Sequence, residues 1–391
     1  MKIMHTGDWH IGRTLNGHSL LPDQRFVLKQ LTEIIREEKP DVLLISGDLY
    51  DRAVPPKEAV AMVDGVLTEI VLDMRLPTLI IGGNHDGRER LDFVSSILKK
   101  SGLYVAGSFQ PDACEPIILG EGSSKTAFWL VPFIKPNEYR SLMGLDKTPD
   151  YNGMYRLIVE DITSKMDPSI LNVFMTHGLI LSGIPETGDI DDSVRPIEIG
   201  GISYADSDLF DAFDYVALGH LHRPQKVGGQ TVRYAGSLLK YSFSEVNQKK
   251  SVTIIDLEKG KPLKVKQVNL SALHDMRVIE GDLDELTAFS MYTDPNREDY
   301  IKAILTNGQR VANPMADLRE VYPNILEMTY QSVIGNTGAP DRSQIKANLD
   351  DPIALFNDFY DMIHGEKPDE DMQEIVKTLM NQTGVNDDEA D

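Results

Sequence analysis

The stretch KIMHTGDWH, residues 2–10, sets the pattern from which the fold can be predicted: a short apolar run leads directly into a glycine followed by polar side chains. The run Lys2 to Thr6 predicts a strand. The same pattern recurs where Asp41 to Ser46 and Thr78 to Ile81 each lead into a glycine. A strand that ends on a glycine and polar residues is typical of a sheet whose edge carries a functional site.

Helices are predicted between these strands, because apolar residues recur at helical spacing over Asp23 to Glu38 and over Glu89 to Lys99. Later apolar runs predict five more strands, at Ala127 to Val131, Leu171 to Thr176, Tyr215 to Leu218, Thr231 to Ala235 and Ser251 to Leu257. Strands that alternate with helices favour a layered α/β fold.

The pattern changes near residue 270. Three short apolar runs, Met276 to Ile279, Tyr300 to Leu305 and Ile325 to Tyr330, predict the strands of a smaller α/β unit, with a helix over Pro314 to Val321. A linker rich in Gly, Asn and Pro then leads to two amphipathic segments. We therefore expect a main domain over 1–270, a small α/β domain over 271–335, and a linker with C-terminal helices over 336–391.

The chain is acidic, with 61 Asp and Glu against 39 Lys and Arg, which gives a net charge of −22. A uniform charge of this sign would repel nucleic acid. The charge is uneven, however: residues 1–270 carry 30 basic and 36 acidic side chains, whereas residues 346–391 carry 3 and 13. Because the main domain is only mildly acidic, the net charge does not exclude DNA as its substrate.

Two observations bear on the compartment. No apolar run approaches the ~18 residues that a membrane-spanning helix needs, so no membrane association is expected. The single cysteine, Cys114, cannot form an intramolecular disulfide, which fits the reducing cytoplasm.

The segment Ser182 to Gly201, with acidic residues over 186–192, predicts a long loop.

Five polar motifs each follow a predicted strand. They are Gly7-Asp8-Trp9-His10, Gly47-Asp48-Leu49-Tyr50-Asp51-Arg52, Gly83-Asn84-His85-Asp86, Thr176-His177-Gly178 and Gly219-His220-Leu221-His222. Any one of them is compatible with a turn, a helix cap or a core histidine. Five in this arrangement predict a single site where the strand ends meet.

The side chains in these motifs predict a metal site. The candidate ligands are Asp8, His10, Asp48, Asn84, His177, His220 and His222. A set of nitrogen and oxygen donors without thiolate suits Mn²⁺, Fe²⁺ or Zn²⁺ better than Ca²⁺ or Mg²⁺. This set is too large for one four-coordinate ion, so two ions that share a bridging ligand are expected, an arrangement typical of phosphoryl chemistry.

These motifs resemble those of the calcineurin-like metallophosphoesterases. Four stretches narrow the resemblance to the SbcD family, the nuclease subunits of bacterial SbcCD complexes: HTGDWHIGRT at 5–14, DLYD at 48–51, GHLHRPQ at 219–225 and YSFSE at 241–245. The resemblance covers nearly the whole chain. It implies a β-sandwich flanked by helices, a small α/β capping domain and C-terminal helices.

The resemblance also assigns roles to the residues. It implies that Asp8, His10, Asp48 and His222 hold one metal ion. Asp48 would bridge to a second ion, whose other ligands would be Asn84, His177 and His220. His85 is implied as the general acid, with Asp86 as the residue that orients it. Arg13, Arg223 and Lys240 flank the motifs and are expected to contact phosphate, the alternative being an ordinary surface role.

The function implied is a DNA nuclease that uses two divalent ions, with Mn²⁺ favoured. It would act as a 3′ to 5′ exonuclease on duplex ends and as an endonuclease on single strands or hairpins, in the cytoplasm at the nucleoid. The implied partners are DNA, an SbcC-like coiled-coil ATPase and a second copy of the chain, in a heterotetramer. The competing hypotheses are a phosphatase for small molecules or phosphoproteins and an inactive scaffold for the ATPase.

The partner-docking segment is expected in the C-terminal part of the chain. Four residues at helical spacing form an apolar stripe there: Leu355, Phe356, Phe359 and Tyr360. This stripe could pack on the chain's own main domain or dock on the ATPase. Its position after a flexible linker favours docking.

Overall fold

A computed structural model gives the fold, and it describes residues 1–110, 115–183, 204–308, 311–331, 353, 356–357, 360, 367–369 and 372–377. Cys114 and the acidic residues 186–192 lie outside this part of the chain. Residues Met1–Tyr330 form one compact unit and Gln331–Asp391 another, and each is described by itself. Among the helices of the described residues, none has the length and apolarity needed to cross a membrane.

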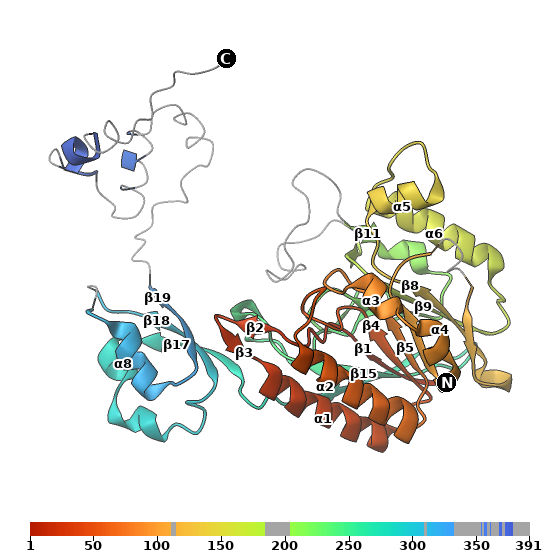
Figure 1. The fold of residues 1–391 in the computed structure, drawn as a ribbon, viewed down its shortest axis with the longest axis horizontal. Coiled ribbons are helices and arrows are strands. Elements are labelled where there is room, and N and C mark those ends of the chain that lie inside the picture. The colour runs from red at the N-terminus through yellow and green to blue at the C-terminus, as the bar shows by residue number, and fades with distance from the viewer. Residues whose placement is uncertain are drawn as a thin grey trace, which may run out of the picture. The chain divides into compact units, whose positions relative to one another are not determined.

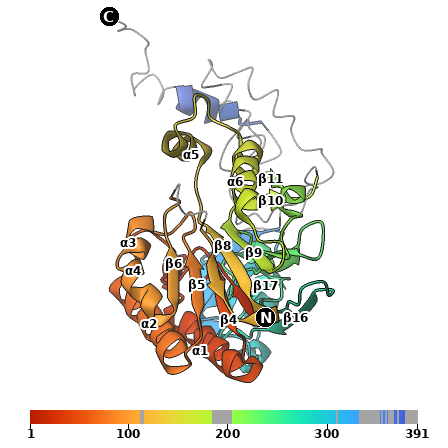
Figure 2. The ribbon, with the colours of Figure 1, turned by 90° about the vertical axis from the view of Figure 1, so that its right-hand side faces the viewer.

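Two six-stranded sheets form the centre of the first unit (Figures 1 and 2). The first has the order β16-β15-β1-β4-β5-β6, with β1 (Lys2–Thr6), β4 (Val42–Ser46), β5 (Thr78–Ile81), β6 (Leu103–Ala106), β15 (Ser251–Asp256) and β16 (Lys264–Asn269). The second has the order β13-β14-β12-β9-β8-β7, with β7 (Ile117–Leu119), β8 (Thr126–Val131), β9 (Leu171–His177), β12 (Tyr215–Gly219), β13 (Gln225–Lys226) and β14 (Val232–Tyr234).

The two sheets pack face to face. Leu44 and Leu79 of the first sheet belong to the same fully buried apolar cluster as Phe128, Val173 and Ala217 of the second. The central strands are therefore covered on both faces, which explains why they are continuous apolar runs instead of alternating patterns.

Helices cover the outer faces of the sandwich. Helices α1 (Leu21–Glu38) and α2 (Lys57–Thr68) pack on the first sheet, and α6 (Tyr151–Lys165) packs on the second, next to α5 (Pro136–Met143). Figure 2 shows α1 and α2 on the side of β4 and β5, and α6 beyond β8 and β9. The result is a helix–sheet–sheet–helix arrangement, so the predicted layered α/β fold is confirmed.

Two helical predictions need correction. The single helix predicted over Glu89 to Lys99 is two short helices, α3 (Arg88–Asp92) and α4 (Ser95–Leu98), because Val94 between them has a φ of 56°. No helix is predicted over Tyr151–Lys165, yet α6 forms there and buries Met154 and Ile158 against the second sheet.

The small sheet near the end of the first unit has the parallel order β17-β18-β19, with β17 (Met276–Gly281), β18 (Tyr300–Leu305) and β19 (Ile325–Tyr330). Helices α7 (Leu283–Leu286) and α8 (Pro314–Val321) pack on it around a separate apolar cluster. The predicted strands and the helix over Pro314–Val321 are confirmed. The domain limits at 270 and 335 stay a prediction.

A buried histidine between the sheets makes the stability of the fold depend on pH. The ring nitrogens of His5 lie 2.8 Å from the Tyr215 hydroxyl and 2.9 Å from Ser46 Oγ. Burial, aided by the charge of Arg233, lowers the pKa of His5 from 6.5 to about 3. Below pH 6.5 His5 therefore binds a proton in the unfolded chain but stays neutral in the folded chain. The free energy of unfolding consequently falls as the pH falls from 6.5 towards 3.

We expect His5→Gln to flatten this dependence, because the side chain then carries no titratable group. Between pH 7 and pH 5 the parent should lose about 2 kcal/mol more unfolding free energy than the variant. Urea unfolding of the metal-free proteins at the two pH values measures this difference. Equal losses in the two proteins would contradict the expectation.

Candidate metal centre

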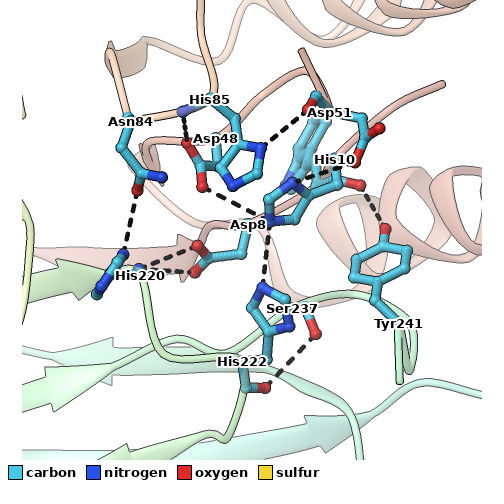
Figure 3. A network of polar contacts seen from close by, with 12 residues as sticks. Asp8, His10, Asp48, Asp51, Asn84, His85, His220, His222, Ser237 and Tyr241 are labelled. Atoms are coloured by element: carbon cyan, nitrogen blue, oxygen red, sulfur yellow. Dashed lines mark hydrogen bonds and ion pairs between the residues drawn. The ribbon is translucent and has the colours of Figure 1, made fainter. Parts of the chain in front are cut away.

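All seven predicted ligands meet at one edge of the sandwich. Strands β1, β4 and β5 run parallel in the first sheet, and β9 and β12 run parallel in the second. Their carboxyl ends lie together, so each motif delivers its side chains from the end of a different strand. Figure 3 shows side chains from both sheets pointing into one small space.

The first group of ligands surrounds His10. Its Nε2 atom lies 3.1 Å from Nε2 of His222 and 3.6 Å from Oδ2 of Asp48. Asp8, His10 and His222 each offer a ligand atom within 4.8 Å of one another, and all three are buried. These residues match the set expected for the first metal ion.

The second group surrounds Asn84. Its Oδ1 atom lies 2.9 Å from Nε2 of His177 and 3.1 Å from Nδ1 of His220. The Nε2 atom of His177 is also 3.4 Å from Oδ2 of Asp48. Because the same Asp48 oxygen faces His10 in the first group, Asp48 stands between the groups, where a bridging ligand is expected.

The hydrogen bonds around the histidines show that these residues fit metal ions. Nδ1 of His177 donates to the Ser46 carbonyl oxygen at 2.9 Å, and Nδ1 of His222 donates to Glu245 Oε1 at 2.9 Å. In the neutral ring the other nitrogen, Nε2, then carries a lone pair. These lone pairs face carboxylate, amide and imidazole acceptors. Acceptors that converge in a buried space need a cation between them.

The pKa values of the metal-free site reflect this crowding. Burial lowers the pKa of His177, but the Asp48 carboxylate outweighs it and raises that pKa to about 9. Burial and the charge of His177 lower the pKa of His220 to about 3. Burial raises the pKa of Asp8 to about 6. Without metal, a proton on His177 thus supplies the positive charge that the carboxylates require.

The backbone at the ligands is strained. Asp8, His10 and Asp48 have φ angles of 51°, 46° and 50°, and His220 has a φ of 112°. Non-glycine residues rarely occupy this region, and each costs of the order of 1–3 kcal/mol. The surrounding structure holds these conformations, and such strain is concentrated at functional sites.

Gly83 provides a test of how tightly the site is built. A Cβ atom at this position would lie 2.1 Å from Oδ1 and 2.4 Å from the backbone nitrogen of Asp48. We expect Gly83→Ala to displace Asp48 and to weaken Mn²⁺ binding by at least about tenfold, by analogy with the loss of other groups that orient ligands. Calorimetric titration with Mn²⁺ measures the effect.

Gly65→Ala in α2 is the matched control, since a Cβ there meets nothing within 4 Å. It should leave Mn²⁺ affinity unchanged and stabilise the helix slightly. If Gly83→Ala bound Mn²⁺ as tightly as the parent, the loops that carry the ligands would have to shift to make room for the added methyl group without loss of affinity.

His85 lies beside the ligands without being one of the two groups. Its backbone N–H donates to Asp48 Oδ1 at 2.9 Å, and its Nδ1 donates to the Asp51 carbonyl oxygen at 2.9 Å. The ring stands edge-on to that of His10, with centroids 4.9 Å apart. Because Nδ1 is engaged, Nε2 is the atom of the His85 ring that would contact a substrate, as the predicted general acid requires.

The expected role of Asp86 needs correction. Its carboxylate accepts the backbone N–H groups of Leu49, Tyr50 and Gly83 at 2.9–3.1 Å, whereas the His85 ring is held by Asp51. Burial raises the pKa of Asp86 to about 6. Asp86 thus ties the two motif loops together and does not orient the His85 ring directly.

The three basic residues expected to contact phosphate lie in different settings. Arg13 pairs with Asp51 at 2.8 Å and its guanidinium lies over the Tyr241 ring, so it is close to the His10 and His85 side of the site. Arg223 is exposed and follows His222. Lys240 is different: its Nζ pairs with Asp275 at 2.8 Å and its side chain is 13% exposed, so it holds the segment that leads into β17 instead of facing the site.

The predicted docking stripe lies half inside and half outside the described residues. Leu355 and Phe359 are outside the described residues. Phe356 and Tyr360 are helical and half-buried, with ring centroids 6.0 Å apart.

Reasoning from the sequence missed the residues that support the ligands. Glu245 and Lys250 are buried beside His222, and Gln24 donates to the His10 carbonyl oxygen at 2.7 Å. The motif YSFSE at 241–245 was the available signal for Glu245, but no site role was assigned to it.

Comparison with known proteins agrees with this geometry. The family model for calcineurin-like phosphoesterases matches residues 1–224. The model for the type 5 capsule protein repressor C-terminal domain, SbcD_C, matches residues 272–364. A crystal structure of a Thermus thermophilus protein aligns with 68% of this chain and 98% of that chain, at a TM-score of 0.38 and 13% identity, which is too distant to support an argument.

Two relatives match almost from end to end. They are proteins of Staphylococcus epidermidis and Staphylococcus saprophyticus, both named as the SbcD subunit of the nuclease SbcCD. Each is 33% identical over 380 residues, which cover 97% of this chain and 98% of the relative. The chain therefore belongs to the calcineurin-like phosphoesterases and, within them, to the SbcD family.

Proposed function

We propose that this chain is a metal-dependent nuclease that hydrolyses phosphodiester bonds in DNA as a subunit of an SbcCD-type complex. The observation that carries the proposal is the convergence of seven nitrogen and oxygen donors, six of them buried, with Asp48 between two groups of them. The names of the two staphylococcal relatives support DNA as the substrate. The complete donor set argues against an inactive scaffold.

Each residue of the site has a separate role in the proposed hydrolysis. Two divalent ions, when bound, supply a hydroxide at neutral pH and positive charge for the phosphate. Asp8, His10, Asp48 and His222 would hold one ion, and Asp48, Asn84, His177 and His220 the other. Asp51 fixes the His85 ring through its carbonyl oxygen, so that His85 Nε2 can give a proton to the leaving oxygen.

The finer features of the activity are part of the same proposal. We infer that the native ion is Mn²⁺, because the donor set mixes imidazole with carboxylate and amide oxygen. The reactions are 3′ to 5′ digestion of duplex ends and cleavage of single strands or hairpins, in the cytoplasm at the nucleoid. Arg13 and Arg223 would contact backbone phosphates.

One metal-loaded preparation tests the function. With Mn²⁺, linear duplex DNA and hairpin DNA should be degraded, and p-nitrophenyl phosphate should be a poor substrate. Efficient hydrolysis of p-nitrophenyl phosphate without DNA cleavage would favour the phosphatase hypothesis instead. No hydrolysis of either substrate, despite bound Mn²⁺, would contradict both enzyme hypotheses.

We also propose two protein partners. An SbcC-like ATPase would bind the C-terminal helices, and a second copy of the chain would complete a heterotetramer. Exposed apolar side chains on α2, on α4 and in the segments beside them would offer a surface for the second copy: Val54, Val60, Leu72, Phe93, Val94 and Ile97.

Removal of residues 331–391 tests the ATPase contact. The truncated protein keeps the whole first unit, so its Mn²⁺-dependent cleavage of single strands should be retained. Its co-purification with the coiled-coil ATPase should be lost. Undiminished co-purification would show that the docking surface lies within residues 1–330.

A further inference from the structure

A buried carboxylate lies behind one of the metal ligands. Glu245 ends the short 3₁₀ helix η6 (Phe243–Glu245), and its side chain is fully buried. Its Oε1 atom accepts from Nδ1 of His222 at 2.9 Å. Its Oε2 atom accepts from Nζ of Lys250 at 2.5 Å. Both carboxylate oxygens are therefore committed inside the protein.

Lys250 completes a clamp around His222. Its side chain is 5% exposed, and Nζ donates to the His222 carbonyl oxygen at 2.9 Å as well as to Glu245. The imidazole and the backbone of His222 are thus held by the two members of one buried ion pair. The ring can neither rotate nor exchange its tautomer without breaking the bond to Glu245.

The other end of the same motif contacts the same pair of ligands. The Tyr241 ring stands edge-on to both His10 and His222, with centroids 5.4 Å and 5.7 Å away, and its hydroxyl donates to the Trp9 carbonyl oxygen. The stretch Tyr241 to Glu245 therefore encloses the first metal position from behind.

The energetics favour a functional reason for this clamp. Burying an ion pair costs desolvation free energy, and a pair of apolar side chains of similar volume is often equally stable. A carboxylate on the far nitrogen of a ligating histidine, however, fixes its tautomer and raises its basicity towards a metal ion. Stability alone does not explain why this ion pair lies beside His222, whereas an effect on the tautomer and basicity of the His222 ring does.

We propose that Glu245 is a positioning residue for the first metal ion, acting through His222, with Lys250 holding the Glu245 carboxylate in place. The proposal rests on the proposed function only in requiring that the two groups of donors bind metal ions. It assigns to Glu245 a selective effect on one of the two ions, because the second group has no contact with this carboxylate among the interactions of the described residues.

The test is calorimetric titration of the full-length protein with Mn²⁺. In Glu245→Gln one of the two binding events should weaken by about 10–100-fold, the usual result of removing a partner of a ligating histidine. The other event should stay within about twofold of the parent, since its ligands keep their own partners. DNA cleavage at low Mn²⁺ should fall and should recover when the Mn²⁺ concentration is raised.

Asp23→Asn is the matched control. Asp23 is also a buried carboxylate that accepts from a histidine Nδ1, that of His274 at 3.1 Å, and it accepts from the Tyr300 hydroxyl at 2.8 Å. His274 is not a metal ligand. This variant should lower the melting temperature while leaving both Mn²⁺ binding events as in the parent.

A double variant controls for a loss of folding in Glu245→Gln. Glu245→Gln leaves the Lys250 ammonium buried without its carboxylate, so the double variant Glu245→Gln/Lys250→Met removes both charges together. Parental Mn²⁺ affinity for both ions in either folded variant would overturn the proposal, as would equal weakening of both ions. A parent that binds two Mn²⁺ ions without cutting DNA would contradict the proposed function alone, and a parent that binds no Mn²⁺ would overturn both.

Discussion

Asp48→Asn is expected to lose Mn²⁺ binding at both positions and to reduce DNA hydrolysis by about three orders of magnitude or more, because a single oxygen of Asp48 faces both groups of donors. Asparagine keeps the size of the side chain but offers a neutral oxygen and an N–H₂ group. The positive charges of two ions would then converge on a site with one carboxylate, Asp8, in place of two. Asp8 also has a ligand atom within 4.8 Å of those of Asp48 and His177, but it is Asp48 whose Oδ2 atom lies next to a ring nitrogen of a histidine in each group.

The loss can be measured without any nuclease assay. Two bound Mn²⁺ ions stabilise the folded parent, so its melting temperature should rise with Mn²⁺ concentration. This rise should be absent in Asp48→Asn. Asp92→Asn is a suitable control, since Asp92 is a half-buried carboxylate that accepts the backbone N–H groups of Gly107 and Ser108 away from the metal ligands. A normal rise in Asp48→Asn would refute the bridging role.

The sequence predicts which side chains come together at the site because each candidate ligand is marked locally. A strand, a glycine and a polar side chain stand next to one another in the chain, and parallel strands bring their ends to one edge. The strand Thr78–Ile81, for example, is predicted with its observed limits and leads directly to Asn84. The convergence of Asn84, His177 and His220 follows from topology, without knowledge of any distance.

Other features depend on side-chain direction, which adjacency in the sequence does not specify. Asp86 follows His85, yet its carboxylate points back to the loop at Leu49 and Tyr50. Lys240 flanks the site in the sequence, yet its side chain pairs with Asp275, just before β17. These residues show that a neighbour of a functional residue along the chain need not share its site.

Sequence patterns did not predict Glu245 or helix α6, for a different reason. Glu245 is 23 positions after His222, and its burial depends on packing that local patterns do not reveal. Helix α6 was missed because its apolar residues include two tyrosines among charged residues, a mixture with no clear helical stripe until the second sheet is in place.

His85→Gln is expected to keep both Mn²⁺ ions and to lose cleavage. The His85 side chain contacts the Asp51 carbonyl oxygen and the edge of His10, and it supplies none of the close donor contacts on Asn84 or Asp48. Glutamine can still donate to Asp51 but is not an acid at neutral pH. The turnover number should therefore fall by about 10²–10⁴-fold, with little change in KM for DNA.

The leaving group separates proton donation from other roles of His85. A DNA alkoxide needs a proton as it departs, whereas p-nitrophenolate is stable without one, so the loss on bis-p-nitrophenyl phosphate should be far smaller than the loss on DNA. His274→Gln controls for the removal of a histidine away from the metal ligands. If His85→Gln lost the same factor on both substrates, then His85 would stabilise charge on the phosphate in the transition state, and the general acid would have to be a water molecule or another residue.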